Sequence, residues 1–230
     1  MTENIVILTG AGISAASGIA TFRGAGGLWR DYDVTSLATP QAFARNPDLV
    51  HEFYNERRAK LAKVEPNAAH FALAALEQKH GAVTLITQNV DDLHARGGSQ
   101  NLIQMHGKLK SALCTHCDTR TDWQGPLDQN TVCPNCGQTG GMRPDIVWFG
   151  EVPHALDQIE AAMRAATLFV SIGTSGAVYP AAGLLDHAHS VGAHTIELNL
   201  ETSERSHEFH ESRIGAAIDL VPQFVQEVLQ

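Results

Sequence analysis

Four cysteines have the spacing that most clearly indicates a chemistry. Cys114, Cys117, Cys133 and Cys136 form two C-x2-C pairs separated by 15 residues. This is the spacing of a four-thiolate zinc site, in which each pair presents two thiolates to one tetrahedral ion. Two disulfides are the alternative, and they are rare in chains without an export signal. We expect one structural zinc ion with no open coordination position, and we interpret His116 as a surface residue.

A glycine-rich segment near the N-terminus matches a nucleotide-binding fingerprint. Gly10, Gly12 and Ala15 follow an apolar run in the pattern G-x-G-x-x-G/A. Such glycines permit a tight turn and a close approach of the backbone to a pyrophosphate at a helix N-terminus, although glycines also serve ordinary turns. The acidic residue that usually follows about 20 residues later is absent, and the Gly-rich segment 21–29 stands there instead. The pattern favours a dinucleotide site but not an ordinary hydride-transfer dehydrogenase.

Short apolar runs predict the strands that must position these groups. They are rich in Val, Ile and Leu and comprise residues 5–8, 83–86, 168–172 and 195–198. Near-continuous apolar runs are typical of parallel strands that are buried on both faces. Helices are predicted between them, over residues 66–81, 153–166 and 180–190. This alternation predicts an α/β fold with a doubly wound parallel sheet.

Two regions interrupt the alternation. Residues 27–65 are too long for one crossover and include a predicted helix over 49–62, whereas residues 107–146 carry the cysteines and look like a zinc ribbon. We expect both to form a small second domain. The remainder would be a Rossmann-like nucleotide-binding domain of residues 1–26, 66–106 and 147–230.

Polar or glycine-rich segments follow all four predicted strands, at residues 9–15, 88–91, 173–176 and 199–201. Ligands of open α/β sheets bind beyond the carboxyl ends of the strands, so these segments define one site. Asn199 or Glu201 could bond the adenosine ribose. His106 could act as a base near neutral pH, although one histidine among twelve is more often structural. Asp91 could instead cap a short helix.

Composition excludes several classes of protein. The chain has 230 residues, 16 Lys and Arg, 25 Asp and Glu, and a formal net charge of −9. This acidic balance argues against phosphate-driven nucleic-acid binding, and no apolar run has the length of a membrane span. The N-terminus lacks the basic and apolar regions of a signal peptide, so we expect a cytoplasmic protein without membrane or nucleic-acid partners. A monomer is compatible with the sequence.

Together these segments resemble the sirtuin family, the NAD-dependent protein-lysine deacylases. Besides the cysteines, the matching segments run in family order over nearly the whole chain, at residues 10–15, 17–19, 21–23, 88–91, 105–107, 149–151, 173–175 and 199–201. Residues 37–40, 53–57 and 173–180 are similar to the bacterial and mitochondrial branch that removes succinyl and malonyl groups. Ala16 and Val90 depart from a common Glu and Ile of the family.

The resemblance implies NAD as co-substrate. Asn89 and Asp91 would hold the nicotinamide carboxamide, and Phe22 would shield the intermediate from returning nicotinamide. The residues implied to bind NAD are Gly10, Ala11, Gly12, Ser14, Ala15, Phe22, Arg23, Trp29, Gln88, Asn89, Val90, Asp91, Gly173, Thr174, Ser175, Asn199, Leu200, Glu201 and Ala217.

The resemblance also implies a reaction. The acyl-lysine carbonyl oxygen would attack the ribose anomeric carbon as nicotinamide leaves, and His106 would then act as general base on a ribose hydroxyl. The products would be free lysine, nicotinamide and O-acyl-ADP-ribose. ADP-ribosyl transfer or NAD hydrolysis at the same site is the alternative activity. A non-enzymatic zinc-ribbon binding module is disfavoured by the intact His106, Asn89 and Asp91.

An acyl-lysine peptide would lie as an added strand between residues 147–151 and 176–178. Tyr54 and Arg57 are three apart on a predicted helix, so both can project from one face. From the residues alone, a packed Tyr54 and a solvated Arg57 beside Arg58 is the simpler interpretation; the resemblance instead implies that they bind an acyl carboxylate. The implied substrate residues are Ala38, Tyr54, Arg57, Val147, Trp148, Phe149, Gly150, Glu151 and Val178.

Overall fold

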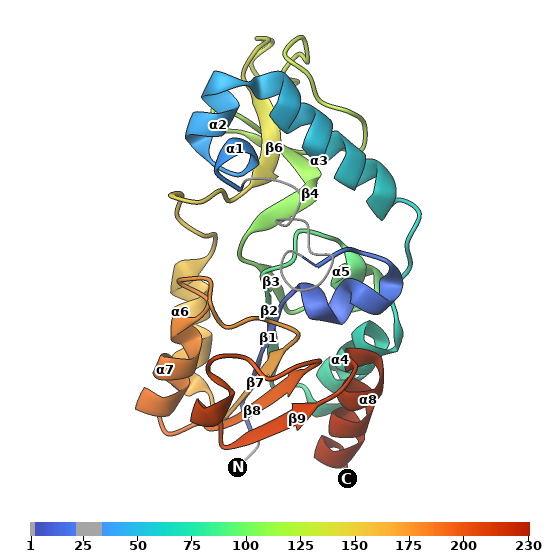
Figure 1. The fold of residues 1–230 in the computed structure, drawn as a ribbon, viewed down its shortest axis with the longest axis vertical. Coiled ribbons are helices and arrows are strands. Elements are labelled where there is room, and N and C mark those ends of the chain that lie inside the picture. Colours follow the sequence, from blue (N-terminus) through green and yellow to red (C-terminus); the bar gives the residue numbers. More distant parts are fainter. Residues whose placement is uncertain (1–2, 22–33) are drawn as a thin grey trace.

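The computed structural model describes residues 3–21 and 34–230, and its main element is a six-stranded parallel sheet (Figure 1). The strand order is β3-β2-β1-β7-β8-β9. The strands are β1 (Ile5–Thr9), β2 (Val83–Thr87), β3 (Leu102–Gln104), β7 (Leu168–Ile172), β8 (His194–Asn199) and β9 (Glu211–Ile214). All four predicted strands are therefore confirmed, and the parallel pairing holds throughout. The chain order reverses between β1 and β7, which makes their carboxyl ends the switch point at which such sheets bind ligands.

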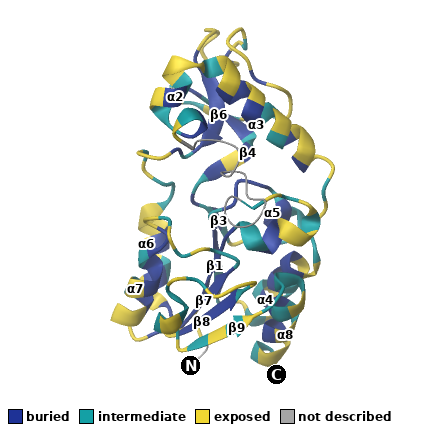
Figure 2. Ribbon diagram, in the orientation of Figure 1, coloured by how far each residue is buried: buried dark blue, intermediate teal, exposed yellow. Residues whose placement is uncertain are grey.

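Helices cover both faces of this sheet, as a doubly wound fold requires. On one face, α4 (Ala68–His80) and α8 (Ala217–Val228) pack against β1 side chains such as Ile5 and Ile7. On the other face, α6 (Leu156–Ala165) and α7 (Gly183–Ser190) pack against Val6 and Leu8. Because alternate side chains of a strand point to opposite faces, a continuous apolar run fills both cores. Figure 2 shows the resulting buried centre with exposed outer helix surfaces.

The predicted helices are present, but three of them begin later than expected. The predictions placed Pro66, Pro153 and Pro180 at the helix starts, whereas the helices begin at Ala68, Leu156 and Gly183. In α4 the reason is that Asn67 is the N-cap, since its side chain accepts a hydrogen bond from Ala69 N. Pro66 therefore lies before the N-cap and is not in the first turn of the helix.

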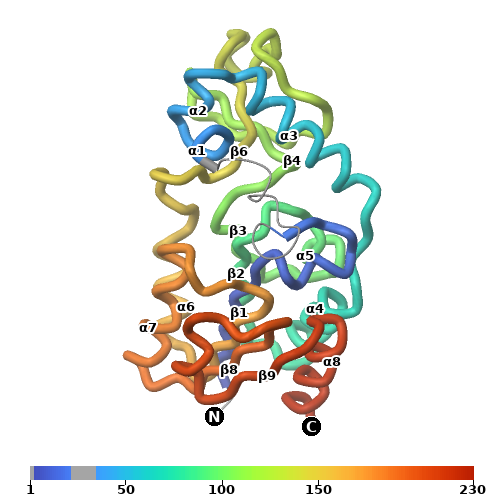
Figure 3. The backbone as a smooth tube through the Cα atoms, in the orientation of Figure 1, coloured from blue at the N-terminus to red at the C-terminus, as the bar shows by residue number. Residues whose placement is uncertain are grey.

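A second, smaller unit contains a three-stranded antiparallel sheet in the order β5-β4-β6. Its strands are β4 (Gly107–Cys114), β5 (Arg120–Asp122) and β6 (Met142–Ile146), and α1 (Val34–Leu37), α2 (Pro40–Arg45) and α3 (Pro47–Leu61) lie beside it. Asn55 of α3 bonds with both the N–H and the C=O of Leu127, and Arg58 Nε donates to Leu109 O at 2.6 Å. The helical insertion and the cysteine segment therefore pack together. Figure 3 shows both termini at the opposite end of the molecule.

The remaining elements are short. They are the 3-10 helix η1 (Ala11–Ser17), α5 (Leu93–Arg96) and the 3-10 helix η3 (Ser206–Glu208). None of the helices in the described ranges 3–21 and 34–230 is both long enough and apolar enough to span a bilayer.

Candidate active site

One large cavity lies at the carboxyl ends of β1, β2, β7 and β8, where it is also bordered by α3 and the segment after β6. Its volume is about 750 Å³, within the usual range of ligand sites. The predicted nucleotide and catalytic residues that line it are Gly10, Ala11, Gly12, Ala15, Gln88, Asn89, Val90, His106, Gly173, Thr174, Ser175, Asn199, Leu200, Glu201 and Ala217. The predicted substrate residues that line it are Ala38, Tyr54, Arg57, Val147, Trp148, Phe149, Gly150, Glu151 and Val178.

The glycine turn after β1 packs directly against the turn after β7. Gly12 N donates to Gly173 O at 2.8 Å. A Cβ on Gly12 would lie 2.7 Å from Gly173 Cα, and one on Gly10 would lie 2.7 Å from Gly173 O. Such contacts are far too short, so glycine is required at both positions by the neighbouring turn. The fingerprint therefore reflects the packing of two ligand-facing turns as well as the approach of a ligand.

Asn89 and Asp91 are held by a buried polar network. Asn89 Nδ2 donates to Gly10 O at 3.1 Å, and Ser14 Oγ donates to Asp91 Oδ2 at 3.0 Å. Asp91 Oδ1 accepts from Leu93 N at 3.0 Å, but the N-cap of α5 is Asp92 and Asp91 is buried, so Asp91 is not the exposed helix cap that the alternative expected. Burial raises the pKa of Asp91, which these hydrogen bonds oppose. Ser14 and Asp91 are buried and do not line the cavity themselves. Their hydrogen bonds support the residues that form the cavity wall.

His106 joins β3 to β4 and lines the cavity. Its Nδ1 lies 3.2 Å from Gln88 O. Since a carbonyl only accepts, this contact assigns the proton to Nδ1 and leaves Nε2 as the basic nitrogen. Burial lowers the pKa of His106, the Gln88 bond opposes this shift, and His154 adds to it. A lowered pKa keeps the imidazole neutral at pH 7, the state in which it can accept a proton.

Thr174 links the loops that follow three strands. Its hydroxyl accepts from Gln88 Nε2 at 2.9 Å, and its carbonyl accepts from Asn199 Nδ2 at 3.0 Å. The segments after β2, β7 and β8 are therefore held in one arrangement around the cavity.

Two arginines that are adjacent on α3 have different environments. Arg57 lines the cavity, with its guanidinium carbon 5.5 Å from the Phe53 ring centroid, and burial lowers its pKa. Arg58 is buried and bonds to Leu109 O and Asn55. The simpler interpretation is therefore confirmed for the packed Tyr54, whereas Arg57 is partly buried at the cavity instead of fully solvated. Tyr54 is buried in the core of the small unit and also lines the cavity.

The segment 147–151 forms the wall beside β6. Glu151 accepts two hydrogen bonds from Arg143, at 2.6 and 2.9 Å, and one from Trp148 N at 2.8 Å. The Arg143 guanidinium carbon lies 3.5 Å from the Trp148 ring centroid, a stacked arrangement that holds both side chains. Phe149 N donates to Ala38 O at 2.9 Å. These contacts fix the shape of the wall, and Phe149 remains half-exposed at its surface.

The four cysteine sulfurs converge in the small unit. The ligand atoms of Cys114, Cys117, Cys133 and Cys136 lie within 4.8 Å of one another. The Sγ atoms of Cys114 and Cys136 are 3.8 Å apart, and so are those of Cys117 and Cys133. Tetrahedral Zn–S bonds of about 2.3 Å separate the sulfurs by a similar distance, and all four cysteines are free. The cluster fits zinc, and none of the four cysteines forms a disulfide.

Some predicted residues lie elsewhere, and some lining residues were not predicted. Phe22, Arg23 and Trp29 lie outside the described residues. His116 is exposed, bonds to Gln138 and is not part of the cysteine cluster, as expected. The lining residues absent from the predicted sets include Thr21, Pro153, Tyr179, Thr202, Ser203, Glu204, Ala216 and Ile218. Most of them extend a predicted segment by a few positions, and this continuity is the signal that could have found them.

Known proteins are similar to this chain in both sequence and fold. Residues 10–180 match the Sir2 family. An NAD-dependent protein deacylase of Caulobacter vibrioides is 52% identical over 229 residues, covering 98% of this chain and 96% of that protein. A structure of a Sir2 homologue variant with ADP-ribose has a TM-score of 0.92 and 39% identity over 97% of this chain and 91% of its own. A Sir2 homologue in complex with NAD has a TM-score of 0.89 and 40% identity over 97% of this chain and 88% of its own. The chain described here therefore belongs to the Sir2 family.

Proposed function

We propose that this protein removes acyl groups from protein lysine with NAD as co-substrate. The observation that carries the proposal is the single cavity that joins the glycine turn after β1 to His106 and to the wall 147–151. Curated relatives at 52% identity named NAD-dependent protein deacylase support the same activity.

The residues of the cavity fit the parts of NAD. The glycine turn and Ser175 would hold the phosphates, Asn199 and Glu201 the adenosine ribose, and Asn89 with Asp91 the nicotinamide carboxamide. Phe22, Arg23 and Trp29 are assigned to the same site from the family resemblance. Bound NAD would supply a ribose carbon that can be transferred as nicotinamide departs.

The chain contributes a base and an oriented substrate. His106 Nε2 would take a proton from a ribose hydroxyl, while the bond from Nδ1 to Gln88 O keeps the ring oriented. The peptide would lie as an added strand between residues 147–151 and 176–178. Products would be free lysine, nicotinamide and O-acyl-ADP-ribose.

We further propose that acidic acyl groups, succinyl and malonyl, are accepted together with acetyl. Arg57 and Tyr54 line the cavity and provide a cation and a hydroxyl for a carboxylate. Ala38 is small and leaves room for the longer chain.

The zinc cluster would be structural, because four thiolates fill a tetrahedral ion. We propose the domain boundaries given above, with residues 27–65 and 107–146 as the small domain, supported by the two separate sheets. A cytoplasmic location is supported by the four cysteines, which form no disulfide and therefore suit a reducing compartment. The acidic charge argues against nucleic-acid partners.

The deciding experiment incubates the protein with NAD and acetyl-, malonyl- or succinyl-lysine peptide and identifies the products by mass spectrometry. O-acyl-ADP-ribose with free lysine is expected. His106→Ala should lose about 100-fold or more in rate and should still bind ADP-ribose, whereas His189→Ala, at an exposed position on α7, should be unaffected. Free ADP-ribose alone, or an ADP-ribosylated protein, would replace deacylation with hydrolysis or transfer.

A further inference from the structure

A buried carboxyl group lies behind one of the loops that line the active-site cavity. Glu197, near the middle of β8, is 2% exposed. Ser203 Oγ donates to its Oε1 at 2.7 Å, Ser212 Oγ donates to its Oε2 at 2.8 Å, and Ser206 Oγ also donates to Oε2. No salt bridge involves Glu197 within residues 3–21 and 34–230. A buried carboxyl group needs such donors, because unpaired burial is strongly unfavourable.

The three serines come from three different elements. Ser203 is in the loop after β8, Ser206 begins the short 3-10 helix, and Ser212 is on β9. Ser203 N also donates to Ser206 Oγ at 2.7 Å. One side chain therefore connects β8 to the loop, to the turn that ends it and to the edge strand.

The connected loop forms part of the cavity wall. Residues 199–204 all line the large cavity. Asn199 Nδ2 lies 3.5 Å from Glu197 Oε1 and donates to Thr174 O at 3.0 Å. Glu197 therefore touches both ends of the lining segment, through Asn199 at its start and Ser203 near its end.

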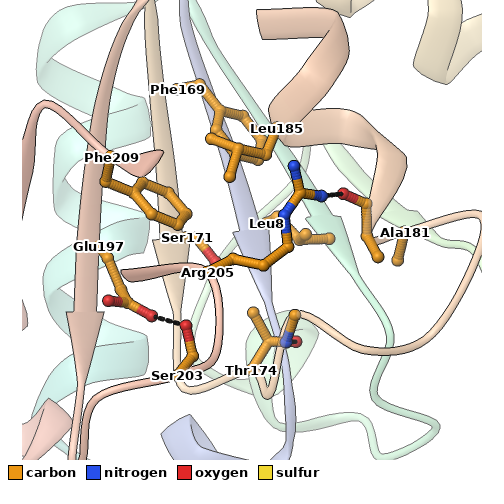
Figure 4. Close-up of a pocket in the computed structure, with 12 residues that line it drawn as sticks. Leu8, Phe169, Ser171, Thr174, Ala181, Leu185, Glu197, Ser203, Arg205 and Phe209 are labelled. Carbon is orange, nitrogen blue, oxygen red and sulfur yellow. Dashed lines mark hydrogen bonds between the residues drawn. The ribbon is translucent and has the colours of Figure 1, made fainter. Parts of the chain in front are cut away.

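Arg205 lies close to this carboxyl group but bonds elsewhere. Figure 4 shows its guanidinium group turned away from Glu197 and toward the chain near Ala181. It donates to Ala182 O at 2.7 Å and pairs with Asp186 at 2.5 Å and with Glu208. Glu197, Ser203 and Arg205 border a separate cavity of about 20 Å³. The segment after β8 is thus held in two ways. Arg205 pairs with Asp186 of α7 and with Glu208, and the serine hydroxyl groups donate hydrogen bonds to Glu197.

We propose that Glu197 is a positioning residue for the NAD-binding loop 199–204, and this inference rests on the proposed use of NAD. A carboxylate is suited to the task because it only accepts, and three hydroxyl groups point at its two oxygens. A carboxamide of nearly the same shape would present an NH₂ group to at least one of these hydroxyls and would loosen the loop. The effect should reach the NAD subsite without altering the acyl or peptide subsites.

The test compares Glu197→Gln with the wild-type protein and with Glu211→Gln. Glu211 is a matched control because it lies on the neighbouring β9, pairs with Arg213 and does not line the cavity. We expect Glu197→Gln to raise the KM for NAD and the Kd for ADP-ribose by about tenfold, the effect of roughly one unsatisfied buried group. The kcat at saturating NAD and the KM for the acyl peptide should change by less than about twofold. Amide hydrogen exchange should increase in residues 200–206 and stay unchanged in β1 and β2.

Ser203→Ala provides a second variant that removes a loop donor and leaves the carboxyl group in place. Its effect on the KM for NAD should not add to that of Glu197→Gln, since both break one network. Unchanged ADP-ribose affinity in both variants would overturn the proposal. A fall in kcat with comparable rises in the KM for NAD and in the KM for the acyl peptide, together with a lower Tm, would also overturn it. These changes would indicate a general structural role. Failure of the wild-type protein to bind ADP-ribose would instead reject the use of NAD, and the inference with it.

Discussion

The indole of Trp148 donates a hydrogen bond from Nε1 to the hydroxyl of Tyr54 at 3.0 Å. Because the hydroxyl accepts this bond, its own proton remains available to an acceptor in the cavity. Burial raises the pKa of Tyr54 to about 12, so the hydroxyl stays protonated at neutral pH. Arg57, one helical turn away on α3, lines the same cavity. A hydroxyl and a guanidinium group therefore border the same cavity.

This arrangement predicts a selective loss in Arg57→Met. Desuccinylation should fall by about tenfold or more, because the acyl carboxylate would be desolvated without a charged partner. Deacetylation should fall much less, since acetyl carries no charge. Ratios of kcat/KM for succinyl- and acetyl-lysine peptides of one sequence provide the measurement.

Arg164→Met is the matched control, because Arg164 is an exposed residue of α6 that pairs only with Glu160 within the described residues. It should leave both activities unchanged. Equal losses on the two peptides in Arg57→Met would show that Arg57 does not select the acyl group.

Gly12→Ala should disable the cavity for a steric reason. The new Cβ would lie 2.7 Å from Gly173 Cα and 2.8 Å from Gly173 O, and both are backbone atoms that cannot rotate away. The turns after β1 and β7 must then separate, so we expect ADP-ribose binding to weaken by about tenfold or more and the Tm to fall, as overpacking usually does. Gly125→Ala is the control, because its Cβ meets nothing within 4 Å. Calorimetric titration with ADP-ribose would settle the comparison, and unaltered binding in Gly12→Ala would contradict it.

The main sheet could be predicted because its central strands are continuous apolar runs that need two cores. The edge strands β3 and β9 could not, since they contain only three and four residues and Glu211 and Arg213 interrupt the apolar pattern of β9. The prolines misplaced the helix starts because a proline before the cap looks the same in sequence as one in the first turn.

The site was predictable at the strand ends and much less so on the insertion. Parallel strands bring their carboxyl ends to one edge wherever the chain goes between them, so the segments after β1, β2, β7 and β8 had to meet. Arg57 and Arg58 are neighbours on a helix, and only the packing of α3 against β4 decides that Arg57 faces the cavity and Arg58 faces Leu109. Gly10 and Gly12 must be glycine because the turn after β7 lies against them, and this contact likewise appears only in the three-dimensional structure.

Removing one thiolate should release zinc. Cys133→Ser leaves three sulfurs, and because metal binding is coupled to folding, the small sheet β5-β4-β6 should lose stability. Metal content after desalting and the Tm measure the outcome. His116→Ala is the control, because His116 lies between two ligands and is absent from the cluster. Full zinc content in a stable Cys133→Ser protein would contradict a four-thiolate site.

The acid limb of the pH profile of kcat/KM should depend on His154. His106 must be neutral to accept a proton, so kcat/KM falls as pH drops through its pKa, which burial and His154 hold below the ordinary 6.5. His154→Gln removes the electrostatic part and keeps the backbone bond from residue 154 N to Met105 O. The limb should therefore move to higher pH. His189→Gln should not move it, and a shift to lower pH in His154→Gln would show that His154 acts differently.

A pair of buried histidines predicts how stability depends on pH. His70 and His94 have ring centroids 4.8 Å apart, and His94 Nε2 lies 3.0 Å from Thr9 Oγ1. Burial lowers the pKa of His70 to about 4 and that of His94 to about 3, the latter with a contribution from His70. Both values lie below the 6.5 of an unfolded histidine, so below pH 6.5 the unfolded chain binds protons that the folded chain excludes. The free energy of unfolding should therefore fall as pH drops from about 6.5 toward 4.

His94→Gln isolates this contribution. Each such histidine adds about 1.4 kcal/mol per pH unit to the slope while only the unfolded form is protonated. The variant should therefore be less stable than the wild-type protein at pH 7.5, because of lost packing, yet lose about 1.4 kcal/mol per pH unit less between pH 6 and 4.5. Urea unfolding at a series of pH values gives both slopes, and the cysteine cluster, present in both proteins, affects them equally. His194→Gln, at an exposed position, controls for the loss of any imidazole. Parallel slopes for wild type and His94→Gln would mean that His94 is protonated in the folded protein as readily as in the unfolded chain.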